Sequence, residues 1–280
     1  MAKHENNQHD QHDHDHDHDQ HDHDQHEHGP ARVSTPEERA LLEPFVDDLH
    51  AYLRSALDGV EGLIAEVGAG DGVIAERLRA DGFDIVAIDS NAETAAAATA
   101  QGREVLHADW LTWDGGGRGP FAALLFTRSL HHIDPLSEAV AQMSRLAPGG
   151  LVVCDEFARE LVDGPGAQFL MDGWALLSAA GLRDDEPQVT DDPLAAWQHR
   201  MTVDHDVASG RQILDALEPI AEIERLEHGP FMAQLVMFRC DPTHPNATAV
   251  RDVVLDTERS RLASGAMAKA GLRLVARLRG

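Results

Sequence analysis

Short apolar runs alternate with stretches of helical pattern through the middle of the chain. The apolar stretches at 63–65 and 83–88 are each long enough for a buried strand, helical patterns follow both, and a third short strand is predicted at 104–107. Two further apolar runs, at 121–126 and 151–154, continue the alternation. This order of elements predicts strands that lie buried in a parallel sheet with helices between them.

The first of these strands runs into a glycine-rich turn. Residues 63–72 read Leu-Ile-Ala-Glu-Val-Gly-Ala-Gly-Asp-Gly, and a helical pattern follows at 73–80. A strand, a glycine turn and a helix in this order hold a nucleotide-like ligand at the carboxyl end of a parallel sheet. Glycine lets the backbone turn tightly and lets the ligand come close. A dinucleotide fingerprint would need a third glycine where Val73 stands, so the spacing disfavours a nicotinamide-dependent oxidoreductase.

Acidic residues follow the next two strands. Asp89 comes about 20 residues after the glycines, where a carboxylate can accept both hydrogen bonds of a ribose diol. Asp109 follows the third strand, with Trp110 beside it. For an isolated acid the simpler interpretation is a solvent-facing loop residue, but the register of Asp89 favours a binding role.

Four motifs in order between residues 63 and 154 resemble those of class I S-adenosylmethionine (SAM)-dependent methyltransferases. The turn at 66–72 is similar to their E-x-G-x-G-x-G motif, and Ala108-Asp109-Trp110 to the motif beside adenine. Leu130-His131-His132 resembles the fourth motif of the small-molecule, type 11/25-like branch, and the Leu-x-Pro-Gly-Gly turn at 146–150 is a further family mark. The resemblance implies a Rossmann-like, seven-stranded α/β fold, to which the segments outside the family core are expected to add a helical cap insertion and a C-terminal helical extension.

The resemblance also implies where SAM binds. Asp89 is expected to bind the ribose, and Asp109 to accept the adenine amino group. Trp110 is expected near the adenine ring, and the alternative is a core aromatic. The full set of expected cofactor-binding residues is Glu66, Gly68, Ala69, Gly70, Asp89, Ser90, Asp109, Trp110 and Thr127.

The implied reaction is direct displacement at the sulfonium methyl group by an atom of a small-molecule acceptor, with oxygen or nitrogen expected. Holding the two reactants in line is the main catalytic effect. His131 and His132 lie at a strand end that faces the expected substrate side, and they are the candidates for a general base. Alternatively, one histidine packs in the core and the other only shapes the cleft. Asp155 and Glu156 lie at the same edge.

The carboxyl half departs from the plain family core. Residues 158–210 are expected to form a helical cap over the active site. Strands predicted at 220–226 and 231–239 would be the sixth and seventh, so the methyltransferase domain is expected to span 31–240. Residues 241–280 are expected to be a largely helical extension that could pack on the domain, mediate a homodimer or form a second lid.

The first 30 residues form a low-complexity tail in which histidine alternates with Asp, Gln and Glu. With nothing apolar to bury, the tail is predicted to be disordered. Imidazole and carboxylate groups bind divalent transition metals such as zinc, nickel, copper and cobalt. This leaves a second hypothesis open: a metal-handling protein on a SAM-binding or inactive methyltransferase fold. The alternative is a solvated tail that binds metal only in the test tube. The candidate metal ligands are His12, His14, His16, His18, His21 and His23.

Composition excludes several other classes. The formal net charge of −26 argues against nucleic-acid binding, which needs clustered Lys and Arg. The two cysteines cannot form a disulfide framework, and Cys154 is expected to be a buried free thiol, which fits a reducing compartment. The sequence shows neither an apolar stretch near the roughly 18 residues of a membrane span nor a signal-peptide pattern. We therefore expect a cytoplasmic protein without a nucleic-acid or membrane partner.

Overall fold

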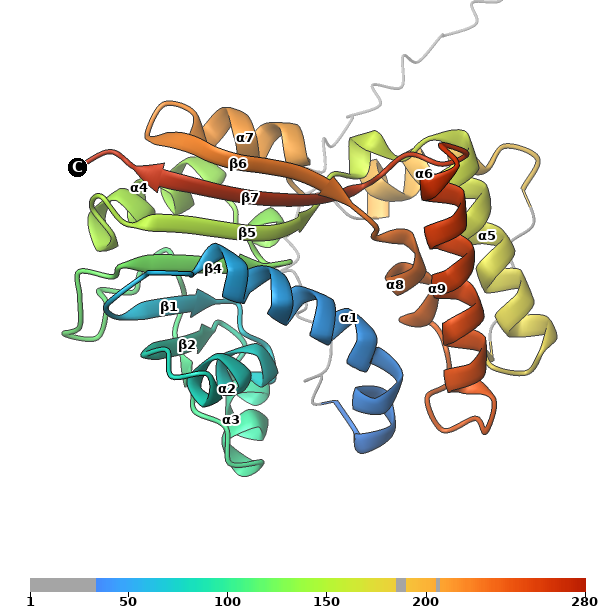
Figure 1. Ribbon diagram of the computed structural model, residues 1–280, viewed down its shortest axis with the longest axis horizontal. Coiled ribbons are helices and arrows are strands. Elements are labelled where there is room, and N and C mark those ends of the chain that lie inside the picture. Colours follow the sequence, from blue (N-terminus) through green and yellow to red (C-terminus); the bar gives the residue numbers. More distant parts are fainter. Residues whose placement is uncertain (1–33, 185–189, 205–206) are drawn as a thin grey trace, which may run out of the picture. The chain divides into compact units, whose positions relative to one another are not determined.

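The computed structural model describes residues 34–184, 190–204 and 207–280. One seven-stranded sheet organises this part of the chain, in the strand order β3-β2-β1-β4-β5-β7-β6 (Figure 1). Strands β1 to β5 are parallel, and β7 runs antiparallel to both β5 and β6. The strands are β1 (Ile64–Val67), β2 (Ile85–Asp89), β3 (Val105–His107), β4 (Ala123–Thr127), β5 (Leu151–Phe157), β6 (Ala221–Gly229) and β7 (Gly271–Leu278). The predicted Rossmann-like α/β fold is confirmed.

Helices cover both faces of the sheet because both faces of its central strands are apolar. Alternate residues of β1, β4 and β5 join two different cores, as expected where successive side chains point to opposite faces. The helices α1 (Pro36–Ala56), α2 (Val73–Ala80) and α3 (Ala92–Ala100) pack on one face. The helices α4 (Leu136–Leu146) and α7 (Gly210–Leu217) pack on the other.

A second group of helices follows the carboxyl end of β5 and has its own apolar core. It consists of α5 (Gly164–Ala179), α6 (Pro193–His199), α8 (Met232–Met237) and α9 (Ala247–Ala263). Helix α1 joins the two cores, because Leu41 packs with this group while Leu53 packs on the sheet. In Figure 1, α1 accordingly runs from the strands toward α8 and α9. No helix within residues 34–184, 190–204 and 207–280 has the length and apolar character needed to cross a bilayer.

The seventh strand predicted at 231–239 is wrong. Most of this segment is helix α8, and the seventh strand is Gly271–Leu278, which pairs with β5 and β6. The segment is nearly all apolar, and a short apolar run fits a buried strand and a buried helix equally well. The sheet therefore extends past residue 240, where the sequence predicts the domain to end. Within the expected helical extension, α9 is helical and the last residues form a strand.

Candidate functional site

The glycine turn after β1 shapes one half of the site. Gly68, Gly70 and Gly72 have φ angles of 69°, 57° and 73°, a region that only glycine adopts without strain. A Cβ on Gly68 would lie 2.5 Å from the Ser129 Cβ, and one on Gly72 would lie 2.6 Å from the Val105 Cγ2. A Cβ on Gly70 would meet no protein atom within 4 Å. Gly68 and Gly72 therefore allow close packing, whereas Gly70 leaves open space over the turn.

Glu66 lies directly below this turn with an unsatisfied carboxylate oxygen. The side chain is buried, and its Oε1 accepts a 3.3 Å hydrogen bond from the Thr127 hydroxyl. Its Oε2 has no partner with good hydrogen-bond geometry among the described residues, although the backbone N–H of Ala75 in α2 lies near enough to the carboxyl group to lower its pKa slightly. Burial raises the pKa of Glu66 to about 8. A buried polar atom without a partner is costly, so Glu66 is suited to receive a cationic or hydrogen-bonding group of a ligand.

Asp89 at the end of β2 is brought against the same turn. Its Oδ2 accepts a 2.8 Å hydrogen bond from the Gly70 N–H, and its Oδ1 accepts one of 2.9 Å from the Asn91 N–H. The backbone of Ala69 is held by a 3.0 Å hydrogen bond to the carbonyl of Ile88. The expected binding residues of β1, β2 and the glycine turn therefore lie at one edge of the sheet.

Two expected binding residues follow β3, and they differ in exposure: Asp109 is exposed to solvent and Trp110 is buried in the core. Asp109 is exposed, and its carboxylate accepts a 2.9 Å hydrogen bond from the Leu111 N–H. Ser90 is also exposed. Trp110 is only 3% exposed, and its indole N–H donates to the Ala139 carbonyl at 3.1 Å. Its ring packs edge-on against Phe126, so Trp110 occupies the core position that was the alternative to adenine contact.

The buried carboxylate of Glu156 organises the turn after β4. Its Oε1 accepts the backbone N–H groups of Ser129 at 3.0 Å and Leu130 at 2.8 Å. Its Oε2 pairs with Nδ1 of His131, a residue of the 3-10 turn Leu130–His132. Because Glu156 accepts two backbone N–H groups on Oε1, we assign it as an acceptor toward His131 as well, which places the ring proton on Nδ1 and leaves Nε2 on the side away from Glu156.

The two adjacent histidines differ in their surroundings. The side chain of His131 is 11% exposed and is held by Glu156. His132 is more exposed, and its ring centroid lies 4.1 Å from that of His131. The sequence places Glu156 at the correct edge but does not reveal its pairing with His131. Strands β4 and β5 are parallel, and Thr127 pairs with Asp155. Glu156, the next residue of β5, therefore lies beside this turn.

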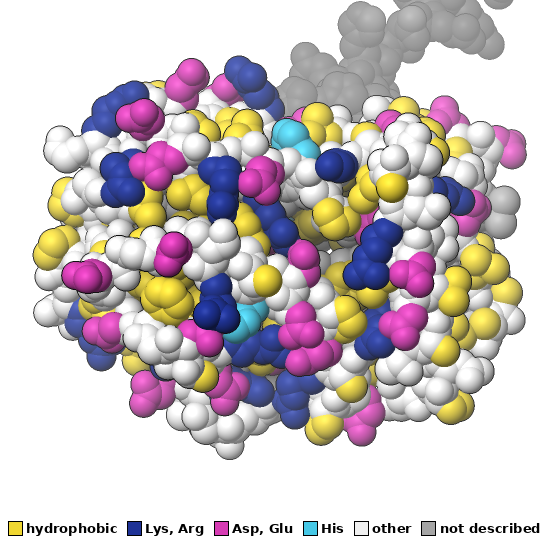
Figure 2. Space-filling view, in the orientation of Figure 1, with side chains coloured by type: hydrophobic (Ala, Val, Ile, Leu, Met, Phe, Trp, Pro, Cys, Tyr) yellow, Lys and Arg dark blue, Asp and Glu magenta, His cyan; other side chains and the backbone are white. Residues whose placement is uncertain are grey.

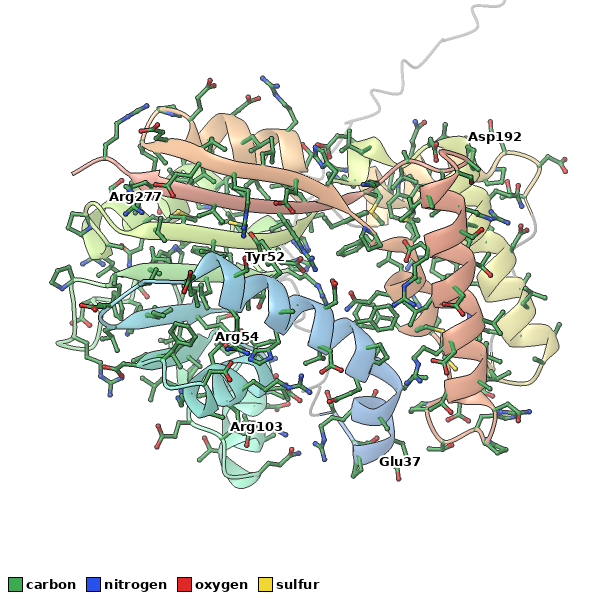
Figure 3. The ribbon with its side chains drawn as sticks, in the orientation of Figure 1. Glu37, Tyr52, Arg54, Arg103, Asp192 and Arg277 are labelled. Carbon is green, nitrogen blue, oxygen red and sulfur yellow. The ribbon has the colours of Figure 1, made fainter. Side chains whose placement is uncertain are left out.

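Asp155 connects the site to β7 and α1 through shared ion pairs. Its carboxylate accepts from Nε of Arg128 at 3.3 Å and from Nε of Arg273 at 2.8 Å. Arg273 also pairs with Asp48 of α1. On the same helix, the guanidinium carbons of Arg225 and Arg273 lie 5.3 and 4.8 Å from the centroid of the Tyr52 ring, which Figure 3 labels where α1 meets the strands. Helix α1 is thereby anchored beside the site.

Acidic and basic side chains are interspersed on the face drawn in Figure 2, with no continuous patch of one sign. Across the described ranges, no group of three or more His, Cys, Asp or Glu side chains is placed to hold a metal ion. The six histidines expected to bind metal lie outside the described residues. Metal binding by the tail therefore stays a prediction from sequence.

Comparisons with known proteins agree with this geometry. The family model described as "Methyltransferase domain" matches residues 39–205, which is more than half of the chain. A search of curated proteins finds no matching sequence.

Several solved structures are similar in fold. The geranyl diphosphate C-methyltransferase of Streptomyces coelicolor A3(2), solved with Mg²⁺, geranyl diphosphate and S-adenosyl-L-homocysteine (SAH), is 14% identical with a TM-score of 0.53. That match covers 89% of this chain and 88% of the other. Phosphoethanolamine N-methyltransferase 2 of Haemonchus contortus, solved with SAM, is 12% identical with a TM-score of 0.53, covering 83% of this chain and 52% of the other.

A third structure shows that the fold alone does not define a reaction. The [4+2]-cyclase SpnF is 17% identical with a TM-score of 0.50, and the match covers 83% of this chain and 80% of that one. The family match therefore carries more weight than any one neighbour. The chain belongs to the methyltransferase domain family and has the fold of the class I SAM-dependent methyltransferases.

Proposed function

We propose that this protein transfers a methyl group from SAM to an oxygen or nitrogen atom of a small-molecule acceptor. The observation that carries the proposal is the pair formed by His131 and the buried Glu156 beside the glycine turn. The two halves of the site are in contact, because the Ser129 hydroxyl donates to the Val67 carbonyl at 2.6 Å. A base and a glycine-lined ligand site therefore lie side by side.

The residues at the strand ends fit SAM. The unpartnered Oε2 of Glu66 is suited to the cationic amino group, and the open space at Gly70 admits a ligand close to the backbone. Asp89, which lies against the glycine turn, is proposed to accept from the ribose hydroxyl groups, and the exposed Asp109 from the adenine amino group. When bound, SAM supplies the electrophilic methyl group.

The protein's own contribution is to orient the acceptor and to remove its proton. Nε2 of His131 accepts that proton as the new bond forms. Glu156 fixes the orientation of the ring and stabilises the positive charge that the ring acquires. The His132 ring lies against that of His131, with centroids 4.1 Å apart and the ring planes tilted by 41°.

The helices within residues 158–210 are proposed to cover the acceptor. Support comes from Phe157, the last residue of β5, whose ring stacks on that of Phe231 with centroids 4.6 Å apart. The indole N–H of Trp197 in α6 donates to the Arg159 carbonyl at 3.2 Å. These contacts connect the end of β5 directly to the apolar core of the helical group.

An acceptor screen tests this function. Purified protein is incubated with SAM and a panel of phenols, amines and carboxylic acids, and SAH formation is measured. With the best acceptor, His131→Ala is expected to lower kcat about 10²- to 10⁴-fold, the usual contribution of a general base. His132→Ala is the matched control and is expected to cost less than about tenfold. A larger loss in the His132 variant would contradict the assignment.

The glycine turn gives a second expected result. Gly68→Ala places a methyl group against Ser129 and also strains a left-handed residue, so it is expected to lower the unfolding midpoint clearly. Gly70→Ala adds only the strain, about 1 to 2 kcal/mol, but its methyl group enters the proposed SAM site. Thermal unfolding and SAH calorimetry on both variants check this. Equal unfolding midpoints for Gly68→Ala and Gly70→Ala would contradict the packing role given to Gly68 and the open space given to Gly70.

A further inference from the structure

The turn that follows β4, residues 127–131, uses most of its polar groups inside the protein. Glu156 accepts two backbone N–H groups of the turn and the Nδ1–H of His131. The hydroxyl groups of the turn also donate internally, Thr127 to Glu66 and Ser129 to the Val67 carbonyl. These groups hold the turn in place, and their N–H and O–H donors are already used inside the protein.

Arg128 is the exception in this turn. Its backbone N–H donates to the Asp155 carbonyl at 2.8 Å, and its Nε donates to the Asp155 carboxylate at 3.3 Å. Among the described residues, neither of its two terminal nitrogens, Nη1 and Nη2, makes a hydrogen bond. The side chain is 24% exposed. The two terminal nitrogens therefore remain as donors at the end of β4, three residues before His131.

The backbone of Arg128 is held in an unfavourable conformation. Its φ angle is 61°, and within the described ranges it is the sole residue other than glycine with a positive φ. A non-glycine residue in the left-handed region costs about 1 to 2 kcal/mol. Such outliers gather at binding sites, where the strain directs a side chain that a relaxed backbone would point elsewhere. The conformation is maintained by the two hydrogen bonds to Asp155.

The surroundings of the guanidinium leave it able to bind an anion. The carboxylate of Asp155 is shared with Arg273, so it does not fully neutralise either arginine. Arg273 also pairs with Asp48, which is largely exposed, so solvent screens that second carboxylate. The Phe231 ring lies 5.9 Å from the Arg128 guanidinium carbon, which restricts the plane of the group.

We propose that Arg128 binds an oxyanion of the methyl acceptor, a carboxylate or a phosphate group, and thereby positions the acceptor beside His131. The inference rests on the proposed function and specifies its substrate class. The two free nitrogens of a guanidinium match the two oxygens of a carboxylate or phosphate in a bidentate pair. Residues 155–210 contain twelve Asp and Glu against three Arg, a charge balance that would favour a cationic substrate, but the donors left at the end of β4 select an anionic one.

The test uses matched small probes on the full-length protein saturated with SAH. Benzoate, phenyl phosphate and uncharged benzamide are titrated by calorimetry into four proteins: wild type, Arg128→Asn, Arg128→Lys and Arg259→Asn. Asparagine tolerates a left-handed backbone, so Arg128→Asn removes the guanidinium without adding strain. Arg128→Lys keeps the positive charge but loses the pair of terminal nitrogens that a guanidinium offers to two oxygens. Arg259 pairs with Asp256 on the exposed side of α9 and serves as the control.

Wild type is expected to bind benzoate or phenyl phosphate at least about tenfold more tightly than benzamide. Arg128→Asn is expected to abolish that preference, Arg128→Lys to keep part of it, and Arg259→Asn to keep all of it. Whichever of benzoate and phenyl phosphate binds more tightly identifies the acceptor's oxyanion as a carboxylate or a phosphate. The inference is overturned if wild type shows no preference for the anions or if the preference survives Arg128→Asn. SAH affinity is expected to be the same in all four proteins, and its absence in wild type would instead overturn the proposed function.

Discussion

Replacing Glu156 by glutamine is expected to lower kcat about 10²- to 10⁴-fold. The carboxylate accepts three donors, and an amide can accept from only one side. The amide nitrogen of glutamine would then face a group that donates to Glu156 in the wild type. Where it faces His131, a hydrogen bond survives only if Nδ1 accepts and the ring proton lies on Nε2. A ring protonated at Nε2 has no lone pair there with which to accept a proton. Acceptor turnover and the ¹⁵N shifts of the His131 ring, which report its tautomer, measure the effect.

Glu258 provides a matched control for this substitution. It is also buried, and its Oε1 accepts the backbone N–H groups of Phe231 at 3.0 Å and Met232 at 2.7 Å. Unlike Glu156, it holds no histidine. Glu258→Gln is expected to lose about 1 to 3 kcal/mol of unfolding free energy with little change in kcat. If both variants lose stability and turnover in the same proportion, Glu156 is structural only.

Replacing Glu66 by glutamine is expected to stabilise the ligand-free protein at alkaline pH. The pKa of Glu66 is raised from 4.5 to about 8, chiefly by burial. Below pH 4.5 the carboxyl group is protonated in the folded and the unfolded protein alike. As the pH rises from 4.5 to about 8, the unfolded chain ionises first, so the folded state loses stability until both forms are ionised.

The loss across this window amounts to a few kcal/mol, because each pH unit between the two pKa values contributes about 1.4 kcal/mol. Glu66→Gln cannot ionise and is expected to escape this loss. Urea unfolding at about pH 5 and about pH 9 checks this: the variant and the wild type are expected to be similar at the lower pH, and the variant more stable at the higher. A constant difference between the two at both pH values would contradict the raised pKa of Glu66.

Glu66→Gln is also expected to weaken SAM binding. This second effect distinguishes the part that Glu66 plays in binding from the stability that its burial takes from the ligand-free protein. If the carboxylate of Glu66 receives the SAM amino group, it must ionise, so binding near neutral pH releases a proton. Calorimetry in two buffers of different ionisation enthalpy detects that proton. Glu66→Gln is expected to abolish the proton release and to raise the Kd of SAM. Unchanged proton release in the variant would show that another group ionises.

The first five strands can be predicted from sequence because local signals agree there. Most of them are apolar runs, and specific turns adjoin two of them, the glycine turn at 68–72 and the Leu-x-Pro-Gly-Gly turn at 146–150. The predicted run at 104–107 and the observed Val105–His107 differ by one residue. The seventh strand has no such boundary. Its sequence position depends on α8 and α9, which are inserted between β6 and β7.

The residues of the site also differ in whether local sequence patterns predict their positions. Glu66 and Gly68 belong to one turn motif, Asp89 follows it at the spacing of a ribose-binding acid, and the structure brings the turn and Asp89 together. The link between His131 and Glu156 spans 25 residues and depends on the register of β4 against β5, which no local pattern records. Trp110 is packed by contacts with α4 and β4, so its neighbours in the sequence do not decide its position.

Calorimetric titration of the full-length protein with SAM, SAH and NAD shows which of these cofactors the strand ends bind. The geometry of the strand ends predicts binding of both adenosyl compounds in the micromolar range and no binding of NAD. Gly70→Ala is expected to weaken both adenosyl compounds while the protein stays folded. Binding of NAD in place of SAM and SAH, or no binding of any of the three, would contradict the assignment of this site.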